Sequence, residues 1–154
     1  MIKRLTIAIA AILSLSPVAK ANVVEDYIYS NPVLKAVHAS GTKIKFTSDR
    51  CETGKIYGSY NSTTDVMVLC IKNHPNLAEL GDTIRHETIH IIQMCNGGPI
   101  LGIQKLTEFA KPTDWSFISQ YPTAVHHIEL EANIGARNLS DAQVVTNFVK
   151  ACNQ

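Results

Sequence analysis

The sequence predicts an α+β fold, in which a small, mostly antiparallel sheet packs against one long helix and further helices follow. Two observations support this class. Segments with alternating or β-rich patterns lie close together between residues 42 and 71. Segments with helical periodicity lie on both sides of them in the chain. The predicted order is therefore helix, sheet, a long central helix, and then C-terminal helices.

The elements before the central helix follow from local patterns. Residues 23–39 carry apolar residues at helical intervals, and Pro32 interrupts them, which predicts one or two short helices. Residues 42–47 alternate polar and apolar side chains, and residues 55–60 are β-rich. Residues 65–71 are almost continuously apolar and β-branched, so we expect a strand packed on the core.

The central helix is predicted to start at an Asp82 N-cap and to run to about Met94, where Gly97-Gly98-Pro99 ends it. After it the pattern weakens before two further helices appear. The predictions are a weakly helical segment at 100–109, a loop at 111–121, a helix from Tyr121 to about Leu139, and a last helix at 141–151 capped by Ser140.

Residues 1–21 have the pattern of a cleaved export signal. A basic start is followed by an apolar run at residues 5–15 and by the cleavage signature Ala19-Lys20-Ala21. The run is too short for a transmembrane anchor, which needs about 20 residues. We therefore expect residues 22–154 to form one secreted or periplasmic domain.

The charge of the expected mature chain argues against two classes of partner. Without residues 1–21 the formal net charge is −2, and the remaining chain has no run of Lys and Arg. Binding to nucleic acid or to an anionic membrane is therefore not expected. After signal cleavage no remaining apolar stretch is long enough to span a membrane.

All four cysteines lie in the expected mature chain, and an even number in an exported protein predicts two disulfides. Zinc thiolates are the alternative, but the chain has no C-x-x-C pair. Three connectivities are possible. Cys51 and Cys70 flank a predicted hairpin, which leaves Cys95 to pair with Cys152.

The motif His86-Glu87-Thr88-Ile89-His90 is the most informative feature of the chain. Residues four apart share one face of a helix, so both imidazoles can bind one metal ion. This H-E-x-x-H pattern is typical of zinc metallopeptidases, in which the Glu is the general base for an activated water. A catalytic zinc needs a third protein ligand. Gln93 and Asn96 stand where metzincins have Gly and His, which excludes that class.

Downstream, Glu129-Leu130-Glu131-Ala132-Asn133 resembles the E-x-x-A-[DN] segment that follows H-E-x-x-H in gluzincin families. The resemblance covers these two short motifs and implies a gluzincin-like zinc metallopeptidase acting on peptide or protein substrates. It implies that His86, His90 and Glu129 bind zinc, that Glu87 is catalytic, and that Asn133 supports the site.

The predicted helix face independently selects Glu129 over Glu131. Glu129 shares an apolar stripe with Val125 and Ala132, whereas Glu131 is rotated away and is expected to be solvated. The alternative for Glu129 is a salt bridge to Arg85 or Arg137.

Three further predictions complete the site. His126 or Tyr121 is a candidate donor to an oxyanion, although a structural role is the alternative for His126 and for His127. His38 and His74 are expected to be structural. The strand at 65–71 is expected to lie beside the cleft and to bind an extended substrate.

Two rivals to the peptidase remain at this stage. One is a non-catalytic zinc-binding module with the same ligands. The other is a disulfide-stabilised interaction domain in which the motif is accidental.

Overall fold

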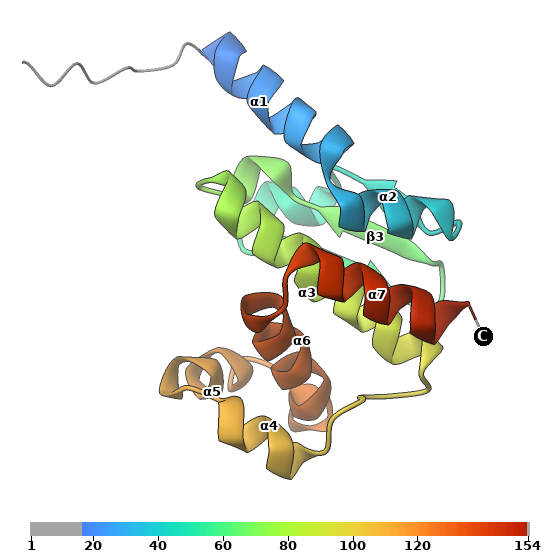
Figure 1. Ribbon diagram of the computed structural model, residues 1–154. Coiled ribbons are helices and arrows are strands. Elements are labelled where there is room, and N and C mark those ends of the chain that lie inside the picture. The colour runs from blue at the N-terminus through green and yellow to red at the C-terminus, as the bar shows by residue number, and fades with distance from the viewer. Residues whose placement is uncertain (1–16, 154) are drawn as a thin grey trace, which may run out of the picture.

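The computed structural model describes residues 17–153 and confirms the α+β class (Figure 1). Helix α1 projects from one end of the molecule, and α4, α5 and α6 gather at the opposite end (Figure 1). The predicted apolar core of the export signal, residues 5–15, lies outside the described residues. Within residues 17–153 no helix is long and apolar enough to cross a membrane.

The N-terminal segment forms two helices, α1 (Pro17–Ser30) and α2 (Pro32–Ala39), with the break at the predicted proline. Asn31 separates them and caps α2, because its side-chain oxygen accepts hydrogen bonds from two backbone N–H groups of the first turn. Pro32 occupies the first helical position, where no N–H is needed.

The sheet has three short strands, β1 (Lys43–Lys45), β2 (Gly58–Asn61) and β3 (Val66–Leu69), in the order β1-β3-β2. β2 is antiparallel to β3, as expected for two strands joined by a short turn. β1 is parallel to β3, because the long connection after β1 returns the chain to the same end of the sheet. The sheet is therefore mixed, and not mostly antiparallel as predicted.

The position of β3 corrects a prediction about substrate binding. β3 is the middle strand and has a hydrogen-bonded neighbour on each side, so it has no open edge to offer a substrate. The edge strand that packs against the central helix is β2. Strand order depends on tertiary packing, and the apolar pattern of residues 65–71 shows only that this strand is buried.

The central helix α3 (Leu77–Cys95) carries the H-E-x-x-H motif. Its N-cap is Asn76 and not Asp82, because the Asn76 side chain accepts a hydrogen bond from the first turn. The helix ends before Gly97-Gly98, where both residues adopt a positive φ that favours glycine.

Four helices follow: α4 (Ile103–Phe109), α5 (Pro112–Ile118), α6 (His126–Asn138) and α7 (Asp141–Cys152). Helix α5 corrects the predicted loop at 111–121. Its proline lies in the first turn, and Asp114 accepts a hydrogen bond from the backbone N–H of Lys111, which caps the helix. Ser140 caps α7 as predicted.

Helices α3 and α6 approach each other closely, and this places α6 alongside the motif. A Cβ added at Gly135 of α6 would lie 2.5 Å from Cδ1 of Ile89 on α3. A side chain at residue 135 would therefore have to displace the end of the Ile89 side chain. α7 packs against both α3 and α2, so α3 lies at the centre of the domain.

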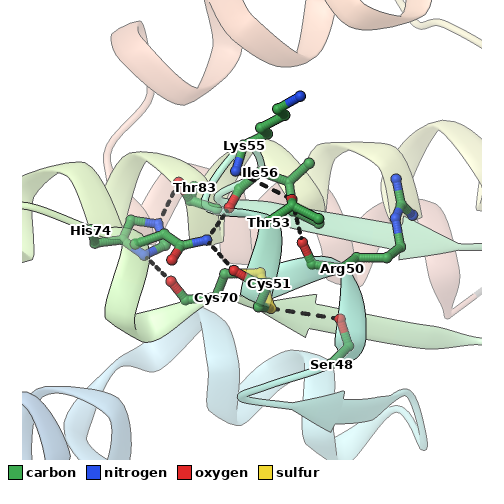
Figure 2. The surroundings of a disulfide bond; sticks show 10 residues. Ser48, Arg50, Cys51, Thr53, Lys55, Ile56, Cys70, His74 and Thr83 are labelled. Atoms are coloured by element: carbon green, nitrogen blue, oxygen red, sulfur yellow. Dashed lines mark hydrogen bonds between the residues drawn. A yellow bond between two sulfur atoms is a disulfide. The ribbon is translucent and has the colours of Figure 1, made fainter.

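Both disulfides are formed with the predicted pairing, Cys51–Cys70 and Cys95–Cys152. The first joins the 3-10 turn η1 (Asp49–Thr53) to the end of β3 (Figure 2). The second joins the C-terminal ends of α3 and α7. The Cα separations of 5.2 and 5.1 Å are ordinary for disulfides.

His74 connects the first disulfide to the central helix (Figure 2). Its Nδ1 lies 2.9 Å from the carbonyl oxygen of Cys70, and its Nε2 lies 2.9 Å from the hydroxyl of Thr83 on α3. Burial lowers the pKa of His74, which favours the neutral ring. These contacts support the predicted structural role.

Candidate metal centre

Three predicted ligands from two helices come together at one point. His86 and His90 lie one turn apart on α3, and their Nε2 atoms are 3.1 Å apart. Glu129 extends from the first turn of α6, and its Oε2 lies 3.4 Å from Nε2 of His86 and 3.7 Å from Nε2 of His90. Among the described residues these three groups form a cluster that is able to hold a metal ion.

The cluster fits a zinc ion. Zinc ligands lie about 2.0–2.2 Å from the metal, so neighbouring ligands in a tetrahedron are roughly 3.3–3.6 Å apart. The three separations, 3.1, 3.4 and 3.7 Å, centre on this range. Oε2 of Glu129 is also buried and has no hydrogen-bond partner within residues 17–153. A buried carboxylate oxygen needs a partner, and a cation would supply one.

The alternative role for Glu129, a salt bridge to arginine, is not what the structure contains. Arg85 pairs with Asp82 and with Asp141. Arg137 pairs with Asp114 on α5. Both arginines are thus engaged with other acids, and Glu129 faces the two histidines.

Burial and the imidazoles compete in setting the charge of Glu129. Burial alone would raise its pKa, but the contacts with His86 and His90 outweigh burial and lower the pKa to about 2. Conversely, burial would lower the pKa of His90, but Glu129 and Glu87 outweigh it and raise the pKa. The centre therefore holds an ionised carboxylate that attracts a positive charge.

Glu87 lies between the centre and strand β2 and is only 6% exposed. Burial raises its pKa, and the electrostatic interactions with His86 and His90 oppose this effect without outweighing it. The backbone of Tyr60 on β2 also contributes to lowering the pKa. A Cβ at Gly58 would lie 2.9 Å from Oε1 of Glu87, so a larger residue there would have to displace this carboxylate or the strand.

A cleft of about 780 Å³ opens over these groups. One wall comes from strand β2, the floor from α3, and the other wall from the turn before α6 and the start of α6. Its lining residues are Arg50, Ile56, Gly58, Ser59, Tyr60, Ser62, His86, Glu87, His90, Gln93, Met94, Gly97, Gly98, Tyr121, Val125, Ile128 and Glu129. The three residues of the cluster and Glu87 are among the residues that line the cleft.

Of the candidate oxyanion donors, Tyr121 lies in the cleft. Burial together with the charges of Glu129 and Glu87 raises the pKa of Tyr121 to about 12, so its hydroxyl keeps its proton. The two candidate histidines bond to backbone oxygens instead. Nε2 of His126 lies 2.8 Å from the carbonyl oxygen of Tyr121, and Nε2 of His127 lies 2.6 Å from that of Leu101. These contacts support the structural alternative for both histidines.

Asn133 and Glu131, which lie near Glu129 on α6, do not make the contacts that the sequence predicts. Asn133 donates to Asp114 on α5 and so joins α6 to α5. Glu131 is not solvated as predicted, because it is 6% exposed and accepts hydrogen bonds from Gln93 and from the backbone of Ile100 and Leu101. The connection between α3 and α4 folds over this face of α6. A helical pattern cannot reveal such a connection.

Gln93 is a site residue that the sequence analysis used only to exclude metzincins. Its Oε1 lies 2.9 Å from Nδ1 of His90. The sequence contained a signal for this contact, because His90 and Gln93 are three residues apart and such residues share a helix face.

Together the fold and the cluster define an α+β domain built around an H-E-x-x-H helix, with a carboxylate supplied by a later helix. The chain belongs to the family described as a domain of unknown function, DUF8637, whose model matches residues 27–152. No curated protein and no solved structure is significantly similar to the chain.

Proposed function

We propose that this protein is an exported, zinc-dependent peptidase in which His86, His90 and Glu129 hold the metal. The observation that carries the proposal is the buried, unpartnered Oε2 of Glu129 facing two imidazole nitrogens. Two histidines and one glutamate are the ligand set of several catalytic zinc sites, in contrast to the cysteine-rich sets of structural sites. The export signal pattern of residues 1–21 and the two disulfides support an extracellular or periplasmic location.

When bound, zinc would polarise a substrate carbonyl and lower the pKa of water. Glu87 is the residue of this chain placed to move protons. Its carboxylate would take a proton from the attacking water and deliver it to the leaving nitrogen of the peptide. Burial, which favours the protonated form of Glu87, suits it to that second step. Tyr121 keeps its phenolic proton and would donate a hydrogen bond to the negative oxygen of the tetrahedral intermediate.

The edge strand β2 is the element that supports an extended peptide as the substrate. The backbone N–H of Cys70 donates to the carbonyl oxygen of Tyr57, so these two residues form a hydrogen-bonded pair. Along an antiparallel ladder, hydrogen-bonded and non-hydrogen-bonded pairs alternate. The backbone N–H and C=O groups of Gly58 and Tyr60 therefore point away from β3. Both residues line the cleft. A peptide could therefore add to β2 by main-chain hydrogen bonds. In this proposal β2, and not β3, is the strand that binds the substrate.

Metal content of the purified, exported protein tests the site. We expect about one zinc per chain, measured by elemental analysis after removal of loosely bound metal. His86→Ala and Glu129→Ala should each lower the zinc content sharply. Stoichiometric zinc in a variant that carries both substitutions would show that the metal binds elsewhere.

Peptide hydrolysis tests the chemistry separately from the metal. Glu87→Gln should keep the zinc and lose hydrolysis of a mixed peptide library, because the amide cannot accept a proton from water. Glu79→Gln is the matched control, since Glu79 is exposed and lies two turns earlier on the same helix. A wild-type protein that binds zinc but cleaves no peptide would favour the zinc-binding module. A protein without zinc would favour the interaction domain.

A further inference from the structure

The side-chain amide of Gln93 has only one orientation that satisfies its neighbours. One end of the amide faces two acceptors, the carbonyl oxygen of Ile128 at 2.9 Å and Oε2 of Glu131 at 2.8 Å. Only the NH₂ end can donate to both. The carbonyl end, Oε1, therefore faces Nδ1 of His90 at 2.9 Å.

This orientation fixes the tautomer of His90. A carbonyl oxygen can only accept, so Nδ1 of His90 must carry the hydrogen. In the neutral ring the hydrogen on Nδ1 leaves a lone pair on Nε2. That lone pair points to the cluster, where Nε2 lies 3.1 Å from Nε2 of His86. Gln93 thereby selects the tautomer in which His90 can bind a metal through Nε2.

Glu131 in turn fixes the orientation of Gln93. Its carboxylate is buried, and it is satisfied by N–H groups: Oε2 accepts from Gln93, and Oε1 accepts from the backbone of Ile100 and Leu101. Its negative charge makes it a strong acceptor, so the NH₂ end of Gln93 is held toward it.

We propose that Gln93 and Glu131 are positioning residues that hold His90 in its metal-binding tautomer and thereby set the metal affinity of the centre. The inference rests on the zinc site of the proposed function. It does not require that the site be catalytic. Partners that orient a ligating histidine typically change metal affinity 10–100-fold when they are removed.

Glu131→Gln tests the relay with little change in shape. The new amide must still accept from the backbone N–H groups of Ile100 and Leu101, so its NH₂ end faces Gln93. Two NH₂ groups then oppose each other unless Gln93 rotates, and rotation turns its NH₂ end toward Nδ1 of His90. We expect zinc affinity, measured by competition with a chelator, to fall about 10–100-fold.

The tautomer itself provides a readout that a merely structural role would not change. In the metal-free protein, ¹⁵N chemical shifts of the imidazole nitrogens should show the hydrogen on Nδ1 of His90 in the wild type. In Glu131→Gln that population should shift toward Nε2–H. The exchanged pair Gln93→Glu with Glu131→Gln restores an acceptor beside His90 and should recover at least part of the lost affinity.

The controls separate this inference from the proposed function. Gln104→Leu changes an exposed glutamine on α4 and should keep wild-type affinity, whereas Gln93→Leu should weaken zinc binding as Glu131→Gln does. Wild-type affinity and an unchanged tautomer in Glu131→Gln would overturn the inference and leave the peptidase intact. A wild-type protein that binds no zinc would overturn both.

Discussion

Gly58→Ala is a sensitive test of how the strand and the motif helix form one site. The new Cβ would lie 2.7 Å from Cγ2 of Thr83, 2.9 Å from Oε1 of Glu87 and 3.0 Å from its Cγ. Non-bonded carbon atoms prefer about 3.5–4.0 Å, so the side chains of Thr83 and Glu87, or strand β2 itself, must move by roughly 0.8–1.3 Å. The carboxylate of Glu87 is among the groups that the new Cβ would touch, whereas the three predicted metal ligands are not.

The expected result is a loss of catalysis without a loss of metal. Displacing a catalytic group by about 1 Å can cost on the order of 100-fold in rate. Overpacking of this kind destabilises a domain by about 1–3 kcal/mol, which leaves a typical domain folded. We therefore expect kcat for peptide hydrolysis to fall roughly 10–100-fold, while zinc affinity stays within about twofold of the wild type.

Gly102→Ala is the matched control. Gly102 has a φ of −64°, and a Cβ there would meet only Oε1 of Gln104 at 3.6 Å. This variant should therefore keep wild-type zinc affinity and rate, with at most a small loss of stability because glycine is a better N-cap of α4 than alanine. If Gly58→Ala hydrolysed peptides at the wild-type rate, the contact between β2 and Glu87 would not position the carboxylate, and the reasoning would be wrong.

Two predictions concern stability. Replacing both cysteines of the Cys95–Cys152 disulfide by serine should cost about 4 kcal/mol by urea unfolding, against about 3 kcal/mol for the other disulfide, because the bonded residues are 57 and 19 positions apart. A smaller loss for the longer loop would contradict the loop-entropy account. Asp114→Asn should cost about 2–3 kcal/mol at neutral pH, since it breaks the pair between the buried Asp114 and the partly exposed Arg137. Burial raises the pKa of Asp114, but Arg137 and the N–H of Lys111 outweigh it and lower the pKa. The stabilisation is therefore complete above the unfolded value of about 4 and is lost as the pH falls through the folded pKa, so wild type and variant should converge in acid. A constant difference between them down to pH about 2 would refute this assignment.

The candidate metal ligands could be chosen from residue spacing along single helices. The two histidines share a face because they are four residues apart. Glu129 is favoured over Glu131 because its neighbours on one face are apolar, but the same argument wrongly placed Glu131 in solvent. The structure brings these three side chains together. The disulfide pairing also followed from the order of the elements.

What the sequence could not predict depends on contacts between distant segments. The order of the strands is one case, since β3 and an edge strand can have the same apolar pattern. The close approach at Gly58 is another, because it arises from Thr83 and Glu87 on a different element. Helix α5 was missed because its short apolar stretch is weak by itself and is stabilised by its capping and by the pair between Asp114 and Arg137.

The two glutamates of α6 together give the strongest reason to expect a ligand at the centre. Both are largely buried, with Glu131 6% exposed and the Glu129 side chain 14% exposed. The fold satisfies Glu131 with N–H groups on both of its oxygens. Two positions earlier in the same helix, Oε2 of Glu129 has no such donor and faces two imidazole nitrogens instead. A chain that satisfies one buried carboxylate so fully has little physical reason to leave its neighbour unpaired, unless a cation completes the second site.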